Sequence, residues 1–231
     1  MLVAIHQPEY FPWLGYFEKM IRADAFVLLD QVQFSKGNYH NRNHIKGPVG
    51  SQWLTIPVLQ HLGQKINEVV TADQHWPVKH WQTLISCYSR AKHFDEVSPL
   101  LADFYRQPGE RLIDHTVRGL RLTATLLGID RNWILASELR VGGNKSDLVL
   151  NICRELGASA YYSGRTGSTY LEREKFRKAE IEIKVQSFLH PRYEQLFMAG
   201  LGFIPNLSVL DLIFNCGPDS GNVIRAQNSG T

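Results

Sequence analysis

The chain has 231 residues, of which 44% are hydrophobic and 20% are charged, so it has ample apolar material for a hydrophobic core. Its net charge of +3 is small, and basic residues are interspersed with acidic ones, which argues against nucleic acid or a membrane surface as the main partner. No apolar run approaches the ~18 residues of a membrane span, and the first residues lack the basic region of a signal peptide. Three widely separated cysteines without a paired metal spacing indicate reduced thiols. We therefore expect a globular, cytoplasmic protein.

Residues 3–30 have the pattern of a strand, a loop, a helix and a second strand. A short apolar run begins at residue 3, a loop rich in proline and aromatic residues follows, helical spacing continues to residue 23, and a second apolar run covers 25–30. This pattern predicts a βαβ unit. Its first loop leaves the carboxyl edge of the sheet and faces the amino end of the helix, where free N–H groups favour an anion.

Polar and aromatic side chains gather in that first loop. Pro8 and Pro12 fix its path, so the loop is pre-shaped. One interpretation is an aromatic plug that closes the end of the sheet, but a plug does not need His6 and Gln7 at the strand end. We favour a pocket for a polar small molecule. His6 is a candidate catalytic base, and the candidate binding residues are Gln7, Tyr10, Trp13, Gly15 and Tyr16.

The second strand ends at the same edge by parallel topology. Asp30 closes it, and amides and a guanidinium follow within a few residues. Side chains with fixed donor and acceptor geometry, gathered at one sheet edge, are typical of a polar binding pocket. We therefore add Arg42 as a catalytic candidate and Asp30, Gln33, Asn41 and Asn43 as binding candidates.

The remainder alternates strands and helices, which predicts an α/β protein with a Rossmann-like, largely parallel sheet. Strands are expected at 51–58, 65–71, 133–136, 158–162 and 181–188, and helices at 76–90, 94–127 with a break around 108–109, 146–156, 170–178 and 207–215. The helical middle segment, about 76–128, is treated as an insertion into a single domain of residues 1–217. The tail, 218–231, is rich in Gly, Ser and Asn, and both disorder and a last strand are open for it.

A second anion-ready junction follows the strand at 158–162. Residues 163–168 combine glycines, hydroxyls and an arginine and lead into a helical pattern. Backbone amides and the side chains of Ser163, Arg165, Thr166 and Ser168 have the chemistry to hold a phosphate, although glycine-serine turns are common. Ser163, Gly164 and Arg165 are binding candidates.

Two candidate catalytic residues lie near the C-terminus. His190 follows a strand and is a candidate general base, the alternative being a histidine that bonds to backbone. Asp211 interrupts an apolar helical face, so as a buried acid it braces a group such as Arg42 or His190, or belongs to the site.

Metal and thiol chemistry have weaker support. His40 and His44 are spaced for one face of a helical turn, and His75 and His80 flank tryptophans, but no carboxylate or cysteine completes a metal site, so no metal ligand is predicted. Cys216 lies in the apolar end of the last predicted helix, which favours an inert buried thiol.

Several stretches together resemble the WbqC-like family. They are the run from His6 to Tyr16, Leu29 to Phe34, Asn41-Arg42-Asn43, Tyr162-Ser163-Gly164, Tyr170-Leu171, His190 to Gln195, and Leu207 to Gly217. Such proteins occur in O-antigen and other polysaccharide gene clusters, and their proposed role is glycyl or other aminoacyl transfer to an amino sugar. The resemblance adds Tyr193, Gln195 and Asn215 to the binding candidates.

A more distant resemblance concerns mechanism. The pattern from Tyr10 to Tyr16 is similar to the histidine-containing loop of nucleotidyltransferase-fold ligases such as pantothenate synthetase, which joins an acid to an amino acid through an acyl-adenylate. Here the loop is one residue shorter, the first histidine is missing and Tyr16 stands in place of the second. The resemblance implies a nucleotidyltransferase-like sheet.

The hypothesis from the sequence is an aminoacyltransferase or amide ligase that uses an amino acid and a nucleotide-linked amino sugar. ATP with Mg²⁺ is the expected cofactor if the acid is adenylated here, and the alternative is a donor that arrives already activated. In the ATP version the loops 10–16 and 163–168 hold phosphates, Arg42 and Arg165 stabilise charge, Gln33, Asn41 and Asn43 orient a substrate, and His6 or His190 takes the proton. The rivals are a non-catalytic sugar-nucleotide binding protein and an ATP-dependent enzyme that modifies nucleic acid.

Overall fold

The computed structural model describes residues 1–107 and 109–227 and contains a central five-stranded sheet. Its strands are β1 (Leu2–His6), β2 (Ala25–Leu28), β7 (Trp133–Leu135), β8 (Ala160–Ser163) and β9 (Glu182–Val185). They lie in the order β7-β2-β1-β8-β9, and every neighbouring pair is parallel. Counted within this sheet alone, the order is 3-2-1-4-5, as in dinucleotide-binding folds. The predicted α/β class with a parallel sheet is confirmed.

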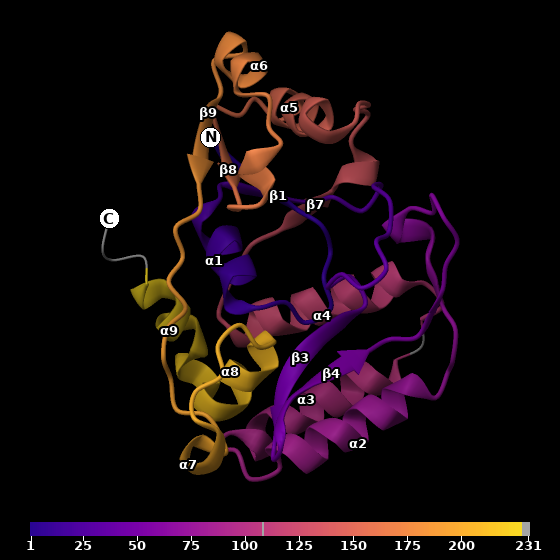
Figure 1. Ribbon diagram of the computed structural model, residues 1–231, viewed down its shortest axis with the longest axis vertical. Helices are drawn as coiled ribbons and strands as arrows, with labels where there is room; N and C mark the ends of the chain where they lie inside the picture. Colours follow the sequence, from indigo (N-terminus) through magenta and orange to yellow (C-terminus); the bar gives the residue numbers. More distant parts are fainter. Residues whose placement is uncertain (108, 228–231) are drawn as a thin grey trace.

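Helices cover both faces of the sheet because its strands alternate their apolar side chains. Val3 and Ile5 of β1 pack with α5 (Lys145–Glu155) and α6 (Arg173–Lys178) in one core cluster. Ala4, which points the other way, packs in a second cluster with α1 (Leu14–Arg22) and α4 (Leu112–Leu126). Figure 1 shows α5 and α6 at one end of the molecule and α4 nearer its middle.

A long insertion separates β2 from β7. It contains the antiparallel pairs β3 (Arg42–Gly47) with β4 (Gly50–Thr55) and β5 (Val58–Leu59) with β6 (Val70–Thr71), then α2 (Trp76–Tyr88), α3 (Phe94–Arg106) and α4. The helical middle was predicted, but β3 was missed. Of the predicted strand at 65–71, only Val70–Thr71 is a strand, β6, and residues Ile66–Glu68 form the 3-10 turn η1. Of the predicted helix break, Pro108 lies outside the described residues.

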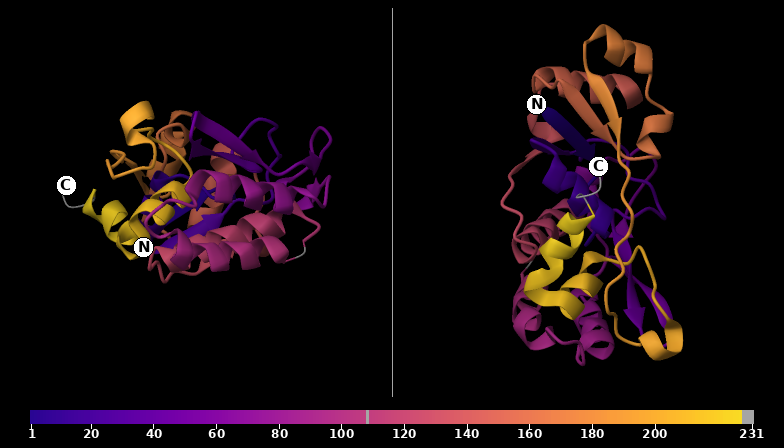
Figure 2. Two further views of the ribbon diagram at one scale, coloured as in Figure 1. Left: turned by 90° about the horizontal axis from the view of Figure 1, so that it is seen from below. Right: turned by 90° about the vertical axis from the view of Figure 1, so that its left-hand side faces the viewer.

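The chain after β9 runs along the molecule to its opposite end. Figure 2 shows residues 186–197 as an extended segment, which we call the strap, that leads to the short helix α7 (Met198–Leu201). Then follow α8 (Val209–Cys216), the 3-10 turn η4 (Gly217–Asp219) and α9 (Ser220–Ala226), and α9 packs against α1. Over residues 220–226 the predicted tail is thus a packed helix, neither disordered nor a strand; residues 228–231 lie outside the described part.

Within the described residues no helix is both long and apolar enough to span a membrane. Cys87 and Cys153 are buried free thiols and Cys216 is a half-buried one. Burial raises the pKa of Cys153 to about 12 and that of Cys216 to about 11, so both thiols are protonated near pH 7.

Candidate functional site

A cavity of about 830 Å³ opens at the carboxyl edge of the sheet. It lies where β1, β8 and β9 end. From β1 the chain builds the sheet toward β2 and β7, and it later returns to place β8 on the other side of β1. The crevice between β1 and β8 is therefore the topological switch point, where open parallel sheets bind ligands. The predicted site residues that line the cavity are His6, Gln7, Trp13, Gly164, Arg165 and His190.

Hydrogen bonds hold the end of β1 in place. The backbone carbonyl of Gln7 accepts bonds from Nδ1 of His6 at 3.1 Å and from the hydroxyl of Tyr16 at 3.2 Å. The side-chain oxygen of Gln7 accepts a bond from Nε2 of His40 at 2.8 Å. Tyr16 is 1% exposed and does not line the cavity, so it supports the end of β1 from the protein interior.

The geometry of His6 makes its other nitrogen a base. A carbonyl only accepts hydrogen bonds, so Nδ1 carries the proton and Nε2 of the neutral ring has a free lone pair. Burial, with a further contribution from nearby Lys19, lowers the pKa of His6 to about 3. His6 is therefore a neutral imidazole at pH 7, in a wall of the cavity.

His190 repeats this arrangement on the strap. Its Nδ1 donates to the carbonyl of Pro191 at 2.9 Å. This contact matches the alternative predicted for His190, a histidine that bonds to backbone. Its Nε2 is buried and has no hydrogen-bond partner among the described residues. Burial lowers the pKa of His190 as well. The cavity thus holds two neutral imidazoles, each with Nε2 available as a proton acceptor.

Two cavity residues of types that are charged in water at pH 7 had no predicted role, Glu9 in the loop and Lys19 in α1. Burial raises the pKa of Glu9 to about 8 and lowers that of Lys19 to about 8. Helical spacing puts Lys19 on the polar side of α1 with Glu18 and Arg22, so no local pattern marked it as a cavity residue. Gln186 was also missed, although it directly follows β9 and so lies at the same sheet edge.

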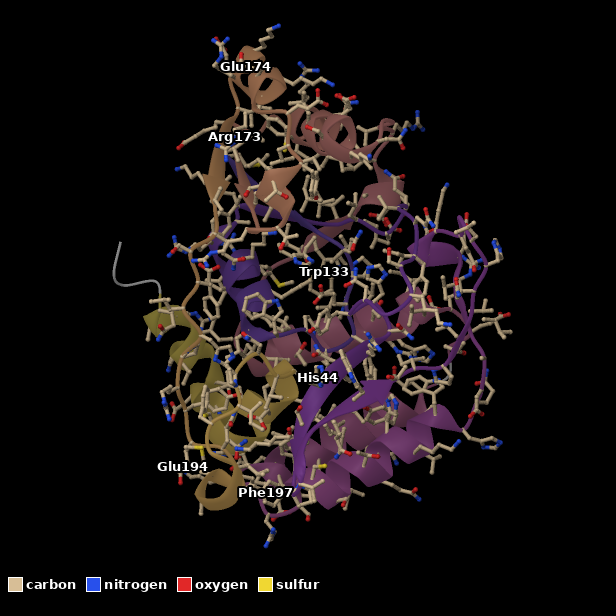
Figure 3. All side chains as sticks on the ribbon, viewed as in Figure 1. His44, Trp133, Arg173, Glu174, Glu194 and Phe197 are labelled. Atoms are coloured by element: carbon tan, nitrogen blue, oxygen red, sulfur yellow. The ribbon has the colours of Figure 1, made fainter. Side chains whose placement is uncertain are left out.

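The loop after β8 contributes Gly164, Arg165, Thr166 and Gly167 to the cavity. Two of its three predicted hydroxyl donors are used inside the loop itself, because Ser163 donates to the carbonyl of Gly164 and Ser168 to that of Arg165. The predicted helix at 170–178 begins only at Arg173, at the upper tip of the molecule in Figure 3. Arg165 therefore provides the cationic side chain of this loop to the cavity.

The aromatic loop has one residue in the cavity wall and others in the core. Tyr10 is fully buried, and its hydroxyl bonds to that of Tyr105 at 2.8 Å and to Nδ1 of His80 at 3.0 Å. Trp13 lines the cavity and meets Phe188 of the strap edge to face, with ring centroids 5.6 Å apart. The loop is thus both a plug and a wall of the cavity.

Gly15 lets the ring of Trp13 pack closely against α1. A Cβ at this position would come within 2.3 Å of the indole. We expect Gly15→Ala to displace Trp13 from the cavity wall and to lower the free energy of unfolding by about 1–3 kcal/mol. Tryptophan fluorescence and urea denaturation measure the two effects. Gly200→Ala is the control, because nothing lies within 4 Å of the place that its added Cβ would occupy; equal behaviour of both variants would contradict the prediction.

The binding residues predicted after the end of β2 do not line the cavity. Asp30 accepts bonds from the backbone and hydroxyl of Ser137 at 2.9 and 2.6 Å. Asn41 donates to the carbonyl of Ile56, and Asn43 donates to that of Phe11 at 2.7 Å, which anchors the aromatic loop. Gln33 is exposed. These amides shape the region around the cavity but do not line it.

Arg42 also lies outside the cavity. Its guanidinium stacks over Trp53 at 4.0 Å and donates to the carbonyl of Gly37. It lies on β3, near His44, which Figure 3 labels. Arg42 therefore contacts Trp53 and Gly37, whereas the carboxylate of Asp30 bonds to Ser137, and neither residue lines the cavity.

Asp211 forms a buried cluster with strap residues. It is fully buried and accepts bonds from the hydroxyls of Tyr88 at 2.9 Å and Tyr193 at 2.8 Å. Gln195 accepts a bond from Lys46, and Asn215 donates to the carbonyl of Asp211. The expectation that Asp211 has a partner was correct, but the partners are tyrosines and not Arg42 or His190. This cluster fastens the strap to α8.

The histidine pairs do not form the arrangement considered from sequence. His40 precedes β3 and His44 lies on it, so they share no helical turn. His80 is buried and bonds to Tyr10 and to the carbonyl of Thr55. No group of three His, Cys, Asp or Glu side chains suited to a metal ion occurs in the described ranges.

The fold and the cavity define an α/β protein of Rossmann-like strand order with a polar cavity at the switch point of its sheet. The model of the WbqC-like protein family matches residues 7–223, and the chain belongs to that family. A protein of Mycobacterium tuberculosis named uncharacterized protein Rv1507c is 32% identical over 226 residues, which cover 96% of this chain and 97% of that protein. No solved structure matches this chain significantly.

Proposed function

We propose that the protein transfers an aminoacyl group, glycyl first among the candidates, to the amino group of a nucleotide-linked amino sugar in O-antigen or related polysaccharide biosynthesis. The observation that carries the proposal is the pair of neutral imidazoles, His6 and His190, in one cavity. An amine attacks an acyl carbon only after it loses its extra proton, and the free Nε2 of a neutral imidazole can accept that proton. The negative charge of a bound phosphate or carboxylate would raise the lowered pKa of His6 toward the pH at which it acts as this base.

The acyl donor must be activated, because amide formation from a free carboxylate is unfavourable in water. Two routes provide activation: ATP adenylates the acid in this cavity, or a thioester or similar donor arrives ready-made. Arg165 and the glycines of the loop after β8 fit ATP phosphates, since they lie at the switch point of a sheet with dinucleotide-binding strand order. Mg²⁺ would enter with the phosphates that it coordinates.

ATP–pyrophosphate exchange with a panel of amino acids, glycine first, tests the ATP route. We expect exchange that depends on one amino acid and then formation of an amide when a nucleotide-linked amino sugar is added. Absence of exchange, both with and without the sugar nucleotide, would reject the ATP route. Transfer from a glycyl thioester is then the remaining form of the proposal, and failure of that reaction too would reject aminoacyl transfer.

Arg165→Ala is expected to raise the KM for ATP by about 10- to 100-fold, because a charge-assisted hydrogen bond to phosphate is lost. Arg165 is exposed at the cavity, so its removal leaves folding stability nearly unchanged. Arg106→Ala is the matched control, since Arg106 is an exposed arginine on α3. An unchanged KM for ATP in Arg165→Ala would exclude this side chain as a phosphate ligand.

A binding protein without catalysis is the second candidate. It is favoured by the aromatic rings of Trp13, Tyr170 and Phe188 in the cavity, which suit a sugar or a base. Such a protein binds the nucleotide-linked amino sugar but gives neither exchange nor transfer. Calorimetric titration beside the two activity assays separates the candidates.

A further inference from the structure

Lys19 has an ammonium group that is almost fully enclosed by protein and weakly bonded. The residue is 3% exposed, yet it lines the cavity. Its Nζ donates to the carbonyl of Ile5 at 3.3 Å, the one hydrogen bond it makes within the described chain. An ammonium group has three donors, and leaving them unsatisfied in a buried place is costly. The remaining donors are therefore available to an acceptor that enters the cavity.

Glu9, like Lys19, is a largely buried ionisable residue with unused hydrogen-bonding capacity. Its side chain is 12% exposed, and Oε2 is buried with no hydrogen-bond partner among the described residues. Its other oxygen lies 3.8 Å from Nδ1 of His6, whose proton already points to the carbonyl of Gln7. Glu9 therefore has acceptor capacity that its protein neighbours leave unused.

The two groups share the cavity and interact electrostatically, but no direct ion pair joins them in the part of the chain that the structure describes. The other acid near Lys19 is Glu18, which is already bonded to Arg22 at 2.6 Å and to Gln186. Opposite Lys19 lies Gly164, whose missing Cβ would be 3.7 Å from Nζ, so the ammonium faces the open loop after β8.

We infer that Glu9 and Lys19 together bind a small zwitterion, an α-amino acid whose ammonium group contacts Glu9 and whose carboxylate contacts Lys19. A zwitterion brings no net charge into the cavity, which limits the cost of desolvation. Its ammonium group also favours the ionised form of Glu9, whose pKa burial raises to about 8 in the empty cavity. A simple anion or a simple cation leaves one of the two groups unpaired. That the bound amino acid then serves as the acyl donor rests on the proposed function.

Ligand-observed NMR titrations of the whole protein with glycine, acetate, methylammonium and glycinamide test the inference without ATP or sugar. We expect glycine to bind at least about tenfold more tightly than acetate or methylammonium, because each of these fragments lacks one charge-assisted contact. Glycinamide, which keeps the ammonium group but lacks the carboxylate, should bind as weakly as methylammonium.

Two variants assign the charges to the residues. Lys19→Met should weaken glycine binding by about 10- to 100-fold and leave methylammonium binding unchanged; Glu9→Gln should weaken glycine binding similarly and leave acetate binding unchanged. Both substitutions replace a buried ionisable group by a neutral one of similar size, and thermal unfolding verifies that they fold. Lys184→Met and Glu182→Gln are matched controls, because this exposed pair on β9 lies outside the cavity.

Glycine that binds no more tightly than acetate and methylammonium would overturn the inference, as would unchanged glycine binding in both cavity variants. The two proposals fail in different ways. Selective glycine binding without exchange or transfer would reject the proposed function and keep the zwitterion site. Exchange or transfer that is unaffected by Lys19→Met and Glu9→Gln would keep the function and reject the site.

Discussion

Replacing His6 by glutamine is expected to lower turnover by about 10²- to 10⁴-fold, the usual contribution of a general base. Glutamine can still donate a hydrogen bond to the carbonyl of Gln7, but it has no basic nitrogen to replace Nε2. The turnover number for amide formation measures the effect. His61→Gln is the control, because His61 is an exposed histidine outside the cavity. A fully active His6→Gln enzyme would remove His6 from the proposed mechanism.

The same variant is expected to resist acid better than the native protein. The pKa of His6 is about 3 in the folded protein against 6.5 for an ordinary histidine. The unfolded chain therefore takes up this proton first, so the stability associated with a neutral His6 is present above pH 6.5 and is lost as the pH falls toward 3. In His6→Gln the decline in unfolding free energy between pH 6.5 and about pH 4 should be smaller. An equal decline in both proteins would contradict the lowered pKa.

Asp211→Ala is expected to lower the free energy of unfolding by about 2–5 kcal/mol. The substitution leaves the hydroxyls of Tyr88 and Tyr193 without their acceptor in a fully buried place and frees the strap from α8. Urea denaturation measures the loss. Asp130→Ala, at an exposed position, should change stability by no more than about 0.5 kcal/mol. Equal stability of the two variants would show that the tyrosines find other acceptors.

Asp211 is expected to make the free energy of unfolding depend on pH in the direction opposite to that of His6. Burial raises its pKa to about 6 from 3.8, so the folded protein holds this proton more tightly than the unfolded chain. The contribution of Asp211 to stability therefore falls as the pH rises from about 4 to about 6. In Asp211→Asn this part of the pH dependence should disappear, which denaturation curves at several pH values will detect.

Much of the fold was predictable because its elements have clear local patterns. The βαβ unit at the start, the helices of the middle segment and the parallel sheet follow from hydrophobic periodicity and from proline and glycine. The strand β3 was missed because its buried and half-buried positions carry Arg42, Asn43 and His44, polar residues that conceal the alternation. β3 is held by its backbone pairing with β4 and not by a local preference of its residues for a strand.

The candidate site was predictable only in part. His6, Gln7 and Arg165 lie at or just after the ends of strands of the sheet, and parallel topology alone brings strand ends to one edge. Asp30 also follows a strand, but its carboxylate is occupied by Ser137, a contact between residues 107 positions apart. Periodicity describes neighbours along the chain and contains no information about such distant partners.

The sequence by itself determined the class of fold, the family and the loop that begins the site, because these depend on local pattern and on a long shared motif. Only the tertiary structure decided which polar residues share the cavity. It brought Lys19 and the strap residue His190 to the cavity with His6, and it placed Arg42 and Asp211 elsewhere. The physical reason is that burial and long-range hydrogen bonds, which no local pattern specifies, decide whether a polar side chain is used by the protein or left for a ligand.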